Sequence, residues 1–310
     1  MKHFLRQSLL FLIPICIVAI VAEVMLRQVP NPYRYKYEWM EQHADSVETL
    51  VFGSSHTFYG IRPEYLEGRA FSLANVSQPW KLDIWLLKRW AERCKQLKAI
   101  IWPISFYSWF GSGRLEDGTE SYRCRFYKIY MHCDLYPDFS KYNLELSDYR
   151  TAKGKLGTAV YNLFHDDADP GYDAYGWGKQ YKLATKDMEK WNDGTEAAAA
   201  VKRHTVKSFE HTEKNIGLMT EVAEFCQQRG IRLVIITTPC WHAYTDSLNS
   251  TQLNRMYELT RQFQQKYHLT YLDYLKDPRF VPDDFFDSNH LSDVGAEKFS
   301  KILKEDLSQE

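Results

Sequence analysis

The sequence predicts an α/β domain built on a doubly wound parallel sheet. From Glu48 to the C-terminus, short apolar segments alternate with longer amphipathic segments, and few hairpin signals lie between them. Strands and helices that alternate in this way form a parallel sheet with helices on both faces. In such a sheet the ligand site lies beyond the carboxyl ends of the strands.

Each expected element follows from local periodicity and from signals at its ends. Gly230 ends one amphipathic helix before an apolar strand, and Ser292 is placed to cap the last helix. The expected strands cover residues 48–53, 98–105, 232–239 and 270–273, and the expected helices cover 79–97, 213–229, 251–267 and 292–307.

Residues 111–208 interrupt this alternation. The segment is rich in Tyr, Trp, Gly and Asp, and about a hundred residues without clear periodicity are too many for a simple loop. We therefore expect a large, cap-like insertion within an α/β domain that covers residues 47–310. The aromatic residues of the insertion suit either stacking on sugar rings or packing of an irregular cap. The alanine run 197–200 predicts a helix interior.

Residues 1–27 predict a signal anchor that crosses the membrane once as a transmembrane helix. Lys2 and Arg6 precede an apolar run from Leu9 to Leu26, which is about the minimum length for a spanning helix. The two cations favour a cytoplasmic N-terminus, so the rest of the chain is expected in the periplasm or at the cell surface. Residues 28–46, rich in tyrosine and basic residues, suit a juxtamembrane connector at the lipid surface.

Two other interpretations of the apolar run stay open, namely a cleaved signal peptide and a buried helix. The end of the run offers a poor cleavage site, which favours the uncleaved anchor. Cys124 and Cys133 lie in one aromatic segment, where an oxidising compartment would allow a disulfide bond. The cysteines in expected core elements suit buried thiols.

The charge balance excludes one broad class of partner. Lys and Arg total 39 against 40 for Asp and Glu, so the chain has no overall positive field to recruit nucleic acid. No grouping of His or carboxylates in the sequence has a recognisable metal spacing, and no segment resembles a phosphate loop. We therefore expect neither a metal nor another cofactor.

A serine block follows the first expected strand. Gly53, Ser54 and Ser55 stand where this strand meets a turn, which presents a side chain at the top of the sheet among backbone N–H groups. Small residues let a substrate carbonyl approach, and the N–H after a nucleophile can help to hold an oxyanion. These features make Ser55 the candidate nucleophile, and a plain polar turn is the competing interpretation.

A second block lies just before the last expected helix. Asp287 precedes His290 by three residues. At this spacing the carboxylate can fix the tautomer and orientation of the imidazole, whose other nitrogen then serves as base to a serine. Because the two blocks flank one doubly wound sheet, we expect Ser55, Asp287 and His290 to form one active site.

The order of these blocks resembles that of the SGNH, or GDSL, hydrolase superfamily. In that family a Gly-Asp-Ser block lies near the start and an Asp-x-x-His near the end, so Gly53, Ser54 and Ser55 match the first block with Ser54 in place of Asp. The similarity runs from about Leu50 to Leu303 except for the insertion. Within the superfamily, the sequence more closely resembles the membrane-anchored branch that includes the D-alanyl transfer protein of the teichoic-acid pathway and the alginate O-acetylation proteins. The resemblance implies an SGNH- or flavodoxin-like three-layer sandwich.

The sequence departs from the superfamily pattern at the oxyanion hole. The family's second block supplies a Gly that the turn 72–78 lacks, and its third block supplies a Gly and an Asn that residues 102–105 lack. Asn75, Ser77 or backbone N–H groups must then complete the hole. Loss of one such donor costs about a hundredfold or more in rate, so weak hydrolysis or transfer to a special acceptor fits this sequence.

Other polar residues near these blocks are candidates for substrate contact. Thr238 and His242 end the expected strand at 232–239 on the ligand side of the sheet. Ser54 and His56 flank the candidate nucleophile. His56 either lines the site or fills the turn, and we favour the turn.

These residues and the resemblance together imply an extracytoplasmic serine esterase or O-acyltransferase. The expected substrate is an acyl ester, acetyl above all, of an envelope glycan or lipid-linked sugar. Acyl transfer would imply a multispanning membrane acyltransferase as a partner. The alternative, which the missing blocks favour, is a catalytically weak or inactive module that binds glycan or scaffolds an envelope assembly.

Overall fold

The computed structural model describes residues 2–136, 143–165 and 169–309, and the chain divides into two compact units. The first unit comprises Met1–Tyr37 and Glu120–Pro170, and the second comprises Glu38–Thr119 and Gly171–Glu310. The insertion expected at 111–208 is therefore divided between the two units. Its residues 137–142 and 166–168 lie outside the described part.

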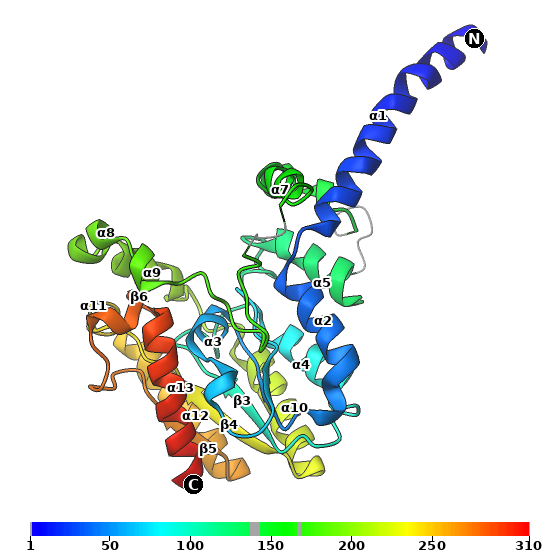
Figure 1. Cartoon of the computed structure of the whole chain (residues 1–310). Coiled ribbons are helices and arrows are strands. Elements are labelled where there is room, and N and C mark those ends of the chain that lie inside the picture. Colours follow the sequence, from blue (N-terminus) through cyan, green and yellow to red (C-terminus); the bar gives the residue numbers. More distant parts are fainter. Residues whose placement is uncertain (1, 137–142, 166–168, 310) are drawn as a thin grey trace. The chain divides into compact units, whose positions relative to one another are not determined.

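The second unit is built on a five-stranded parallel sheet, which confirms the predicted α/β class (Figure 1). The strand order is β2-β1-β3-β4-β5, and every neighbouring pair is parallel. This is a common order of doubly wound sheets, in which a ligand binds where the strand order reverses, here between β1 and β3. The strands are β1 (Thr49–Val51), β2 (Ala70–Ser72), β3 (Ala99–Pro103), β4 (Arg232–Thr237) and β5 (Thr270–Asp273).

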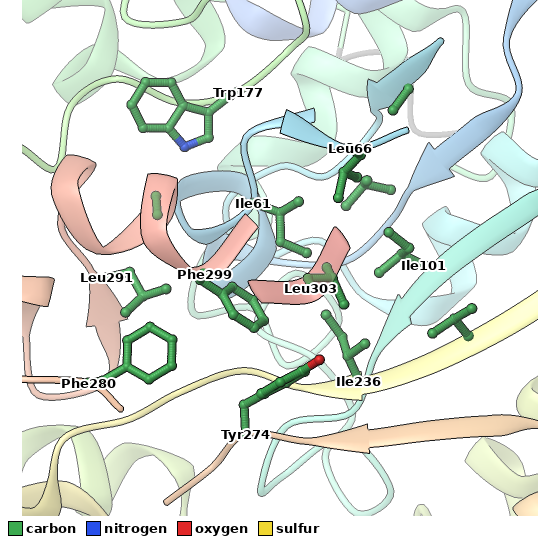
Figure 2. Packing of buried hydrophobic residues seen from close by; sticks show 14 of the residues in the cluster. Ile61, Leu66, Ile101, Trp177, Ile236, Tyr274, Phe280, Leu291, Phe299 and Leu303 are labelled. Atoms are coloured by element: carbon green, nitrogen blue, oxygen red, sulfur yellow. The ribbon is translucent and has the colours of Figure 1, made fainter. Parts of the chain in front are cut away.

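One face of the sheet packs against α13 (Asp293–Gln309). Successive side chains of a strand point to opposite faces, and the register neighbours Val51, Ile101 and Val234 share the face toward α13. They form a buried cluster with Phe299 of α13, which Figure 2 shows in part. Burial of side chains of this size contributes roughly 1.5–3 kcal/mol each, so this layer is a main source of stability.

The opposite face is also covered by helices. Trp102 of β3 points to this face, where its ring centroid lies 6.4 Å from that of Trp80 in α4 (Trp80–Trp90). The helix α10 (Thr212–Arg229) contacts both α4 and β4, and α12 (Ser250–Tyr267) contacts β5. The sheet therefore has helices on both faces, as the sequence predicts.

Several helix ends form where the sequence predicts them. Gly230 ends α10 with φ = 64°, a conformation that favours glycine. Ser292 caps α13, because its Oγ accepts a hydrogen bond from the backbone N–H of Gly295 (3.2 Å). The predicted alanine helix is α9 (Thr195–His204).

The remaining elements of the second unit are short. They include a two-stranded antiparallel sheet of β6 (Phe285–Asp287) and β7 (His290–Leu291). The other α-helices are α3 (Ser55–Gly60), α8 (Met188–Asp193) and α11 (His242–Thr245). The 3-10 turns are η1 (Ala44–Ser46), η2 (Pro63–Tyr65), η5 (Leu183–Thr185) and η6 (Pro282–Asp284).

The first unit contains the N-terminal helix α1 (Lys2–Gln28). Within the described residues, its segment Arg6–Gln28 is the one stretch long and apolar enough to cross a membrane, as an anchor or a signal segment. The helix α1 contacts α7 (Tyr149–Tyr161) and η4 (Glu145–Ser147). The unit also contains η3 (Ser121–Arg123) and α5 (Cys124–Met131).

The segment expected as a connector at 28–46 is mostly helical. It forms α2 (Pro32–His43), and the boundary between the two units falls inside this helix. Cys124 and Cys133, for which the sequence allowed a disulfide bond, are both buried thiols. Burial raises the pKa of the Cys133 thiol to about 11.

Candidate active site

Gly53 fixes the backbone that presents Ser55. It follows β1 with φ = 113°, a conformation that favours glycine. A Cβ at this position would lie 2.2 Å from Cγ of Pro103, so only glycine lets the loop pass this close to the end of β3. The chain then enters α3 at Ser55. Ser55 therefore lies at the carboxyl edge of the sheet, beside the point where β1 and β3 pair.

Asp287 and His290 face each other across the antiparallel pair β6 and β7. The carboxylate is held locally, because Oδ1 of Asp287 accepts hydrogen bonds from the backbone N–H groups of Asn289 (3.0 Å) and His290 (2.8 Å). Asp side chains commonly bind the backbone just ahead of them in turns. The three-residue spacing of the motif thus has a local structural cause.

Ser55, His290 and Asp287 form one chain of hydrogen bonds. Oγ of Ser55 lies 2.8 Å from Nε2 of His290, and Nδ1 of His290 lies 2.9 and 3.0 Å from the two carboxylate oxygens of Asp287. A carboxylate only accepts, so Nδ1 carries the proton and Nε2 is free to accept from the serine hydroxyl. This is the arrangement that a base needs to activate a serine.

The charge on Asp287 is maintained by its neighbours. Burial acts to raise the pKa of this carboxyl, but the charge and hydrogen bond of His290, with the two backbone N–H groups, outweigh burial and hold the pKa below its usual value. The carboxylate therefore stays ionised and can stabilise positive charge on the imidazole.

Glu196 of α9 supports the loop that carries Asp287. Its Oε1 accepts from the backbone N–H of Ser288 (2.8 Å) and its Oε2 accepts from the Ser288 hydroxyl (3.0 Å). Burial, followed by the charge of Asp287, raises the pKa of Glu196. Part of the insertion thus positions the second motif.

A second imidazole, that of His56, stacks on His290 with ring centroids 4.7 Å apart and planes 16° apart. Nδ2 of Asn289 lies 3.1 Å from Nε2 of His56 and 3.2 Å from Nδ1 of His290. Because Nδ1 of His290 carries a proton, Asn289 donates to His56. His56 is buried in α3 and lines the site, so the interpretation that it fills a turn is wrong.

Burial, followed by the charge of His290, lowers the pKa of His56 to about 3. The second ring is therefore neutral near pH 7. With Nε2 accepting from Asn289, the proton of His56 is on Nδ1, which lies 3.4 Å from Oγ of Ser105. His56 thus links the ends of β1 and β3 to the second motif.

Aromatic rings also pack against His290. Tyr181 meets the imidazole edge to face, with centroids 5.2 Å apart. Tyr181 also stacks on Tyr59 (3.8 Å) and on Phe286 (4.3 Å). This packing restricts rotation of the His290 imidazole, the candidate base.

The oxyanion candidates lie in two turns near the serine. Ser54 precedes α3, and its side chain hydrogen-bonds to Tyr107. Asn75 is buried, and its Nδ2 donates to Oε1 of Gln78 (3.2 Å) and to the carbonyl of Leu73 (3.4 Å). The amide nitrogen of Asn75 is thus already engaged within the protein.

Ser77 has φ = 59°, in the left-handed region that favours glycine. Thr238 is buried just beyond β4, and among the described residues no hydrogen bond joins it to Ser55 or His290. His242 is exposed on α11. The structure therefore does not bring Thr238 or His242 into the hydrogen-bonded chain.

Three residues that surround the hydrogen-bonded series Ser55–His290–Asp287 were not predicted from the sequence. Asn289 lies inside the Asp287–His290 motif, so its position alone could have marked it as a site residue. Glu196 and Tyr181 come from the irregular insertion, where no periodicity marks a side chain for the site.

No protein-family model matches the chain, and no curated protein matches its sequence. Among the described residues, no group of three or more His, Cys, Asp or Glu side chains is arranged to hold a metal ion. The geometry defines an α/β domain with a hydrogen-bonded Ser–His–Asp chain at the carboxyl edge of its sheet.

Proposed function

We propose that this chain is a serine esterase or O-acyltransferase with Ser55 as its nucleophile. The observation that carries the proposal is the continuous hydrogen-bonded chain from Ser55 through His290 to Asp287, with contacts of 2.8 and 2.9 Å. Such distances allow proton transfer without rearrangement.

The chemistry follows from the protonation states of the three residues. Oγ of Ser55 attacks the carbonyl carbon of an ester while its proton passes to Nε2 of His290, and Asp287 stabilises the imidazolium. The tetrahedral intermediate collapses, and His290 gives the proton to the departing alcohol. Water or a sugar hydroxyl then attacks the acyl-serine, with His290 again acting as the base.

Backbone N–H groups are the best donors for the oxyanion. The amide of Asn75 is engaged elsewhere, and the N–H of Gly53 donates to Oδ1 of Asp83 (3.0 Å). The N–H groups of Ser55 and His56 stand in the first turn of α3, where no intrahelical acceptor exists. These two N–H groups therefore support an oxyanion hole formed by the first turn of α3, which also carries the nucleophile.

We propose that the chain is a membrane-anchored SGNH-type enzyme. The strand order and the two motifs support this class. An anchor with the domain in the periplasm or at the cell surface favours an acyl ester of an envelope glycan or lipid-linked sugar, acetyl above all. Acyl transfer would draw its donor from a multispanning membrane acyltransferase.

A fluorophosphonate probe tests the nucleophile. We expect the full chain to be labelled on Ser55, Ser55→Ala to lose the label, and Ser105→Ala to keep it, because the Ser105 hydroxyl contacts His56 and Tyr107 and, among the described residues, has no hydrogen bond to Ser55 or His290. Unlabelled wild-type protein, alongside a control esterase that labels normally, would overturn the covalent mechanism.

One observation favours a second candidate, a weak or inactive module that binds glycan or scaffolds an envelope assembly. One of the side chains expected to complete the oxyanion hole, that of Asn75, is engaged with Gln78. Complementation separates the two candidates: the module requires Ser55→Ala to function in the cell like the wild type, whereas the enzyme requires a loss comparable to deletion.

A further inference from the structure

A stripe of exposed side chains, apolar except for Lys153, runs along α7 in the first unit. Its apolar residues follow one another at intervals of seven, four and four positions, which places them on one helical face. The stripe continues into the turn after α7, where the N–H of Phe164 donates to the carbonyl of Tyr161 (3.0 Å). All its apolar members are exposed, and Phe164 is 77% exposed; they are Tyr149, Leu156, Val160 and Phe164, with Leu163 beside them.

The segment that carries the stripe is fastened to the end of α1. The carboxylate of Glu23 accepts hydrogen bonds from the backbone N–H groups of Glu145 and Leu146, both 3.0 Å long. The Arg27 guanidinium donates to the carbonyl of Asn143 (2.6 Å). These contacts fix η4 and the start of α7 beside the last two turns of α1.

The space between the two helices is lined mostly by apolar side chains. A cavity of about 420 Å³ lies between the end of α1 and α7, and Val24, Met25, Ala159 and Leu163 are among its lining residues. Val24 is itself exposed, like most of the apolar run before it. The stripe therefore extends the surface that α1 would present to lipid.

A buried ionic network keeps α7 in this position. The carboxylate of Glu145 accepts from the Tyr130 hydroxyl (2.5 Å) and pairs with Lys155 of α7 (3.0 Å) and Arg125 of α5 (3.2 Å). Removing one partner of a buried charge set is costly, so these contacts hold α5, η4 and α7 together. The exposed stripe is thus a fixed surface of the unit.

The length of α1 sets the depth of this surface. The candidate span Arg6–Gln28 has 23 residues. At 1.5 Å per residue it is about 34 Å long, slightly more than the roughly 30 Å of a bilayer's hydrocarbon core. Arg27, which holds the α7 segment, is one residue from the end of this span and then lies at the membrane interface, and Glu23 lies about one helical turn deeper. Exposed Arg150 and Lys153 on α7 suit the phosphate groups found at that depth.

We propose that α7 and the turn after it lie in the bilayer interface beside the end of α1, with Leu156, Val160 and Phe164 in contact with lipid. The proposal rests on α1 as a membrane helix and is independent of the chemistry at Ser55. The interfacial helix gives the first unit a second attachment to the membrane and fixes its orientation there.

Site-specific photocrosslinking of the full chain tests this contact. p-Benzoylphenylalanine replaces Phe164 or Val160 in the stripe, Thr158 on the opposite exposed side of the same helix, or Val18 within the span, each in a separate variant. The protein is reconstituted in vesicles of phosphatidylcholine and phosphatidylglycerol. We expect at least about tenfold more lipid adduct at Phe164 and Val160 than at Thr158, because the stripe would face the lipid whereas Thr158 would face away from it, and immersion of a large apolar side chain is favoured by roughly tenfold or more.

Three results would overturn the proposal. Lipid adducts at Val18 without any at Phe164 or Val160 would mean that α1 spans the bilayer while α7 stays in water. Absence of adducts at Val18 as well would remove the anchor on which the proposal depends. Adducts of Val160 with a protein instead of lipid in native membranes would assign the stripe to a membrane-protein partner.

Discussion

The imidazoles of His56 and His290 stack with their centroids 4.7 Å apart, and only one of the two rings contacts the candidate nucleophile. Two charged rings at this distance would repel each other. Burial, followed by the charge of His290, lowers the pKa of His56 to about 3 and leaves its ring neutral, so His290 can accept a proton without a charged neighbour. The stack is thus compatible with a base at His290.

The buried neutral state of His56 predicts a loss of stability in acid. Between pH 6.5 and about 3 the unfolded chain binds a proton at His56 that the folded chain does not, so the free energy of unfolding falls as the pH falls. This group alone should lower it by about 2 kcal/mol from pH 7 to pH 5. Urea unfolding of the full chain in detergent at both pH values measures the difference.

The matched variants for this measurement are His56→Gln and His242→Gln. His56→Gln removes the titrating group and should reduce the pH difference by about 2 kcal/mol. His242 is exposed on α11, so its replacement should leave the difference unchanged. An equal pH difference in wild type and His56→Gln would contradict a neutral, buried His56.

Replacement of Asp287 by Asn should abolish activation of Ser55. The Asn carbonyl would keep the two backbone hydrogen bonds, so its NH₂ group would face Nδ1 of His290 and force the proton to Nε2. That tautomer cannot accept from Ser55, and a fall of about 10⁴ in the rate of fluorophosphonate labelling is expected. Asp246→Asn, which alters only an exposed pair with Lys276, is the control. Unchanged labelling of Asp287→Asn would exclude the proposed role of this carboxylate.

Glu196 should act by holding the loop and not through its charge. Glu196→Gln retains acceptor and donor groups for the N–H and hydroxyl of Ser288, whereas Glu196→Ala loses both contacts. We expect the labelling rate of Glu196→Gln to stay near that of the wild type and that of Glu196→Ala to fall by about a hundredfold, as a misplaced base would cause. Equal losses in both variants would instead point to the carboxylate charge.

The elements that the sequence predicted are those with strong periodicity and clear ends. α10, β4 and α12 each combine a clear apolar pattern with such signals, as Gly230 shows at the end of α10. The proximity of Ser55 to His290 followed from the order of two blocks around a parallel sheet, since carboxyl ends of parallel strands share one edge.

Features that depend on tertiary contacts could not be predicted from the sequence patterns. The strand β2 has three residues and α3 has six, too few for a periodic signal. The helix expected over 79–97 ends at Trp90, since only packing decides where a weakly capped helix stops. His56 has no partner nearby in sequence, because Asn289 and His290 reach it from the opposite end of the chain.

Gly53→Ala should destabilise the protein and displace the nucleophile. The added methyl group would lie 2.2 Å from Cγ of Pro103 and 2.7 Å from Oγ1 of Thr57, and φ = 113° is strained for alanine. Strain and overpacking together should lower the free energy of unfolding by about 3 kcal/mol. Labelling of Ser55 should fall with it, since the same loop presents the hydroxyl.

The control for Gly53→Ala is Gly217→Ala within α10. A Cβ at Gly217 meets no atom within 4 Å, so alanine should raise the free energy of unfolding by about 0.5–1 kcal/mol through its higher helix propensity. Urea unfolding of both variants compares a required glycine with a replaceable one under the same conditions. If Gly53→Ala were as stable as the wild type and labelled normally, the loop would not depend on the left-handed backbone at Gly53, and the close passage past Pro103 could not be what positions Ser55.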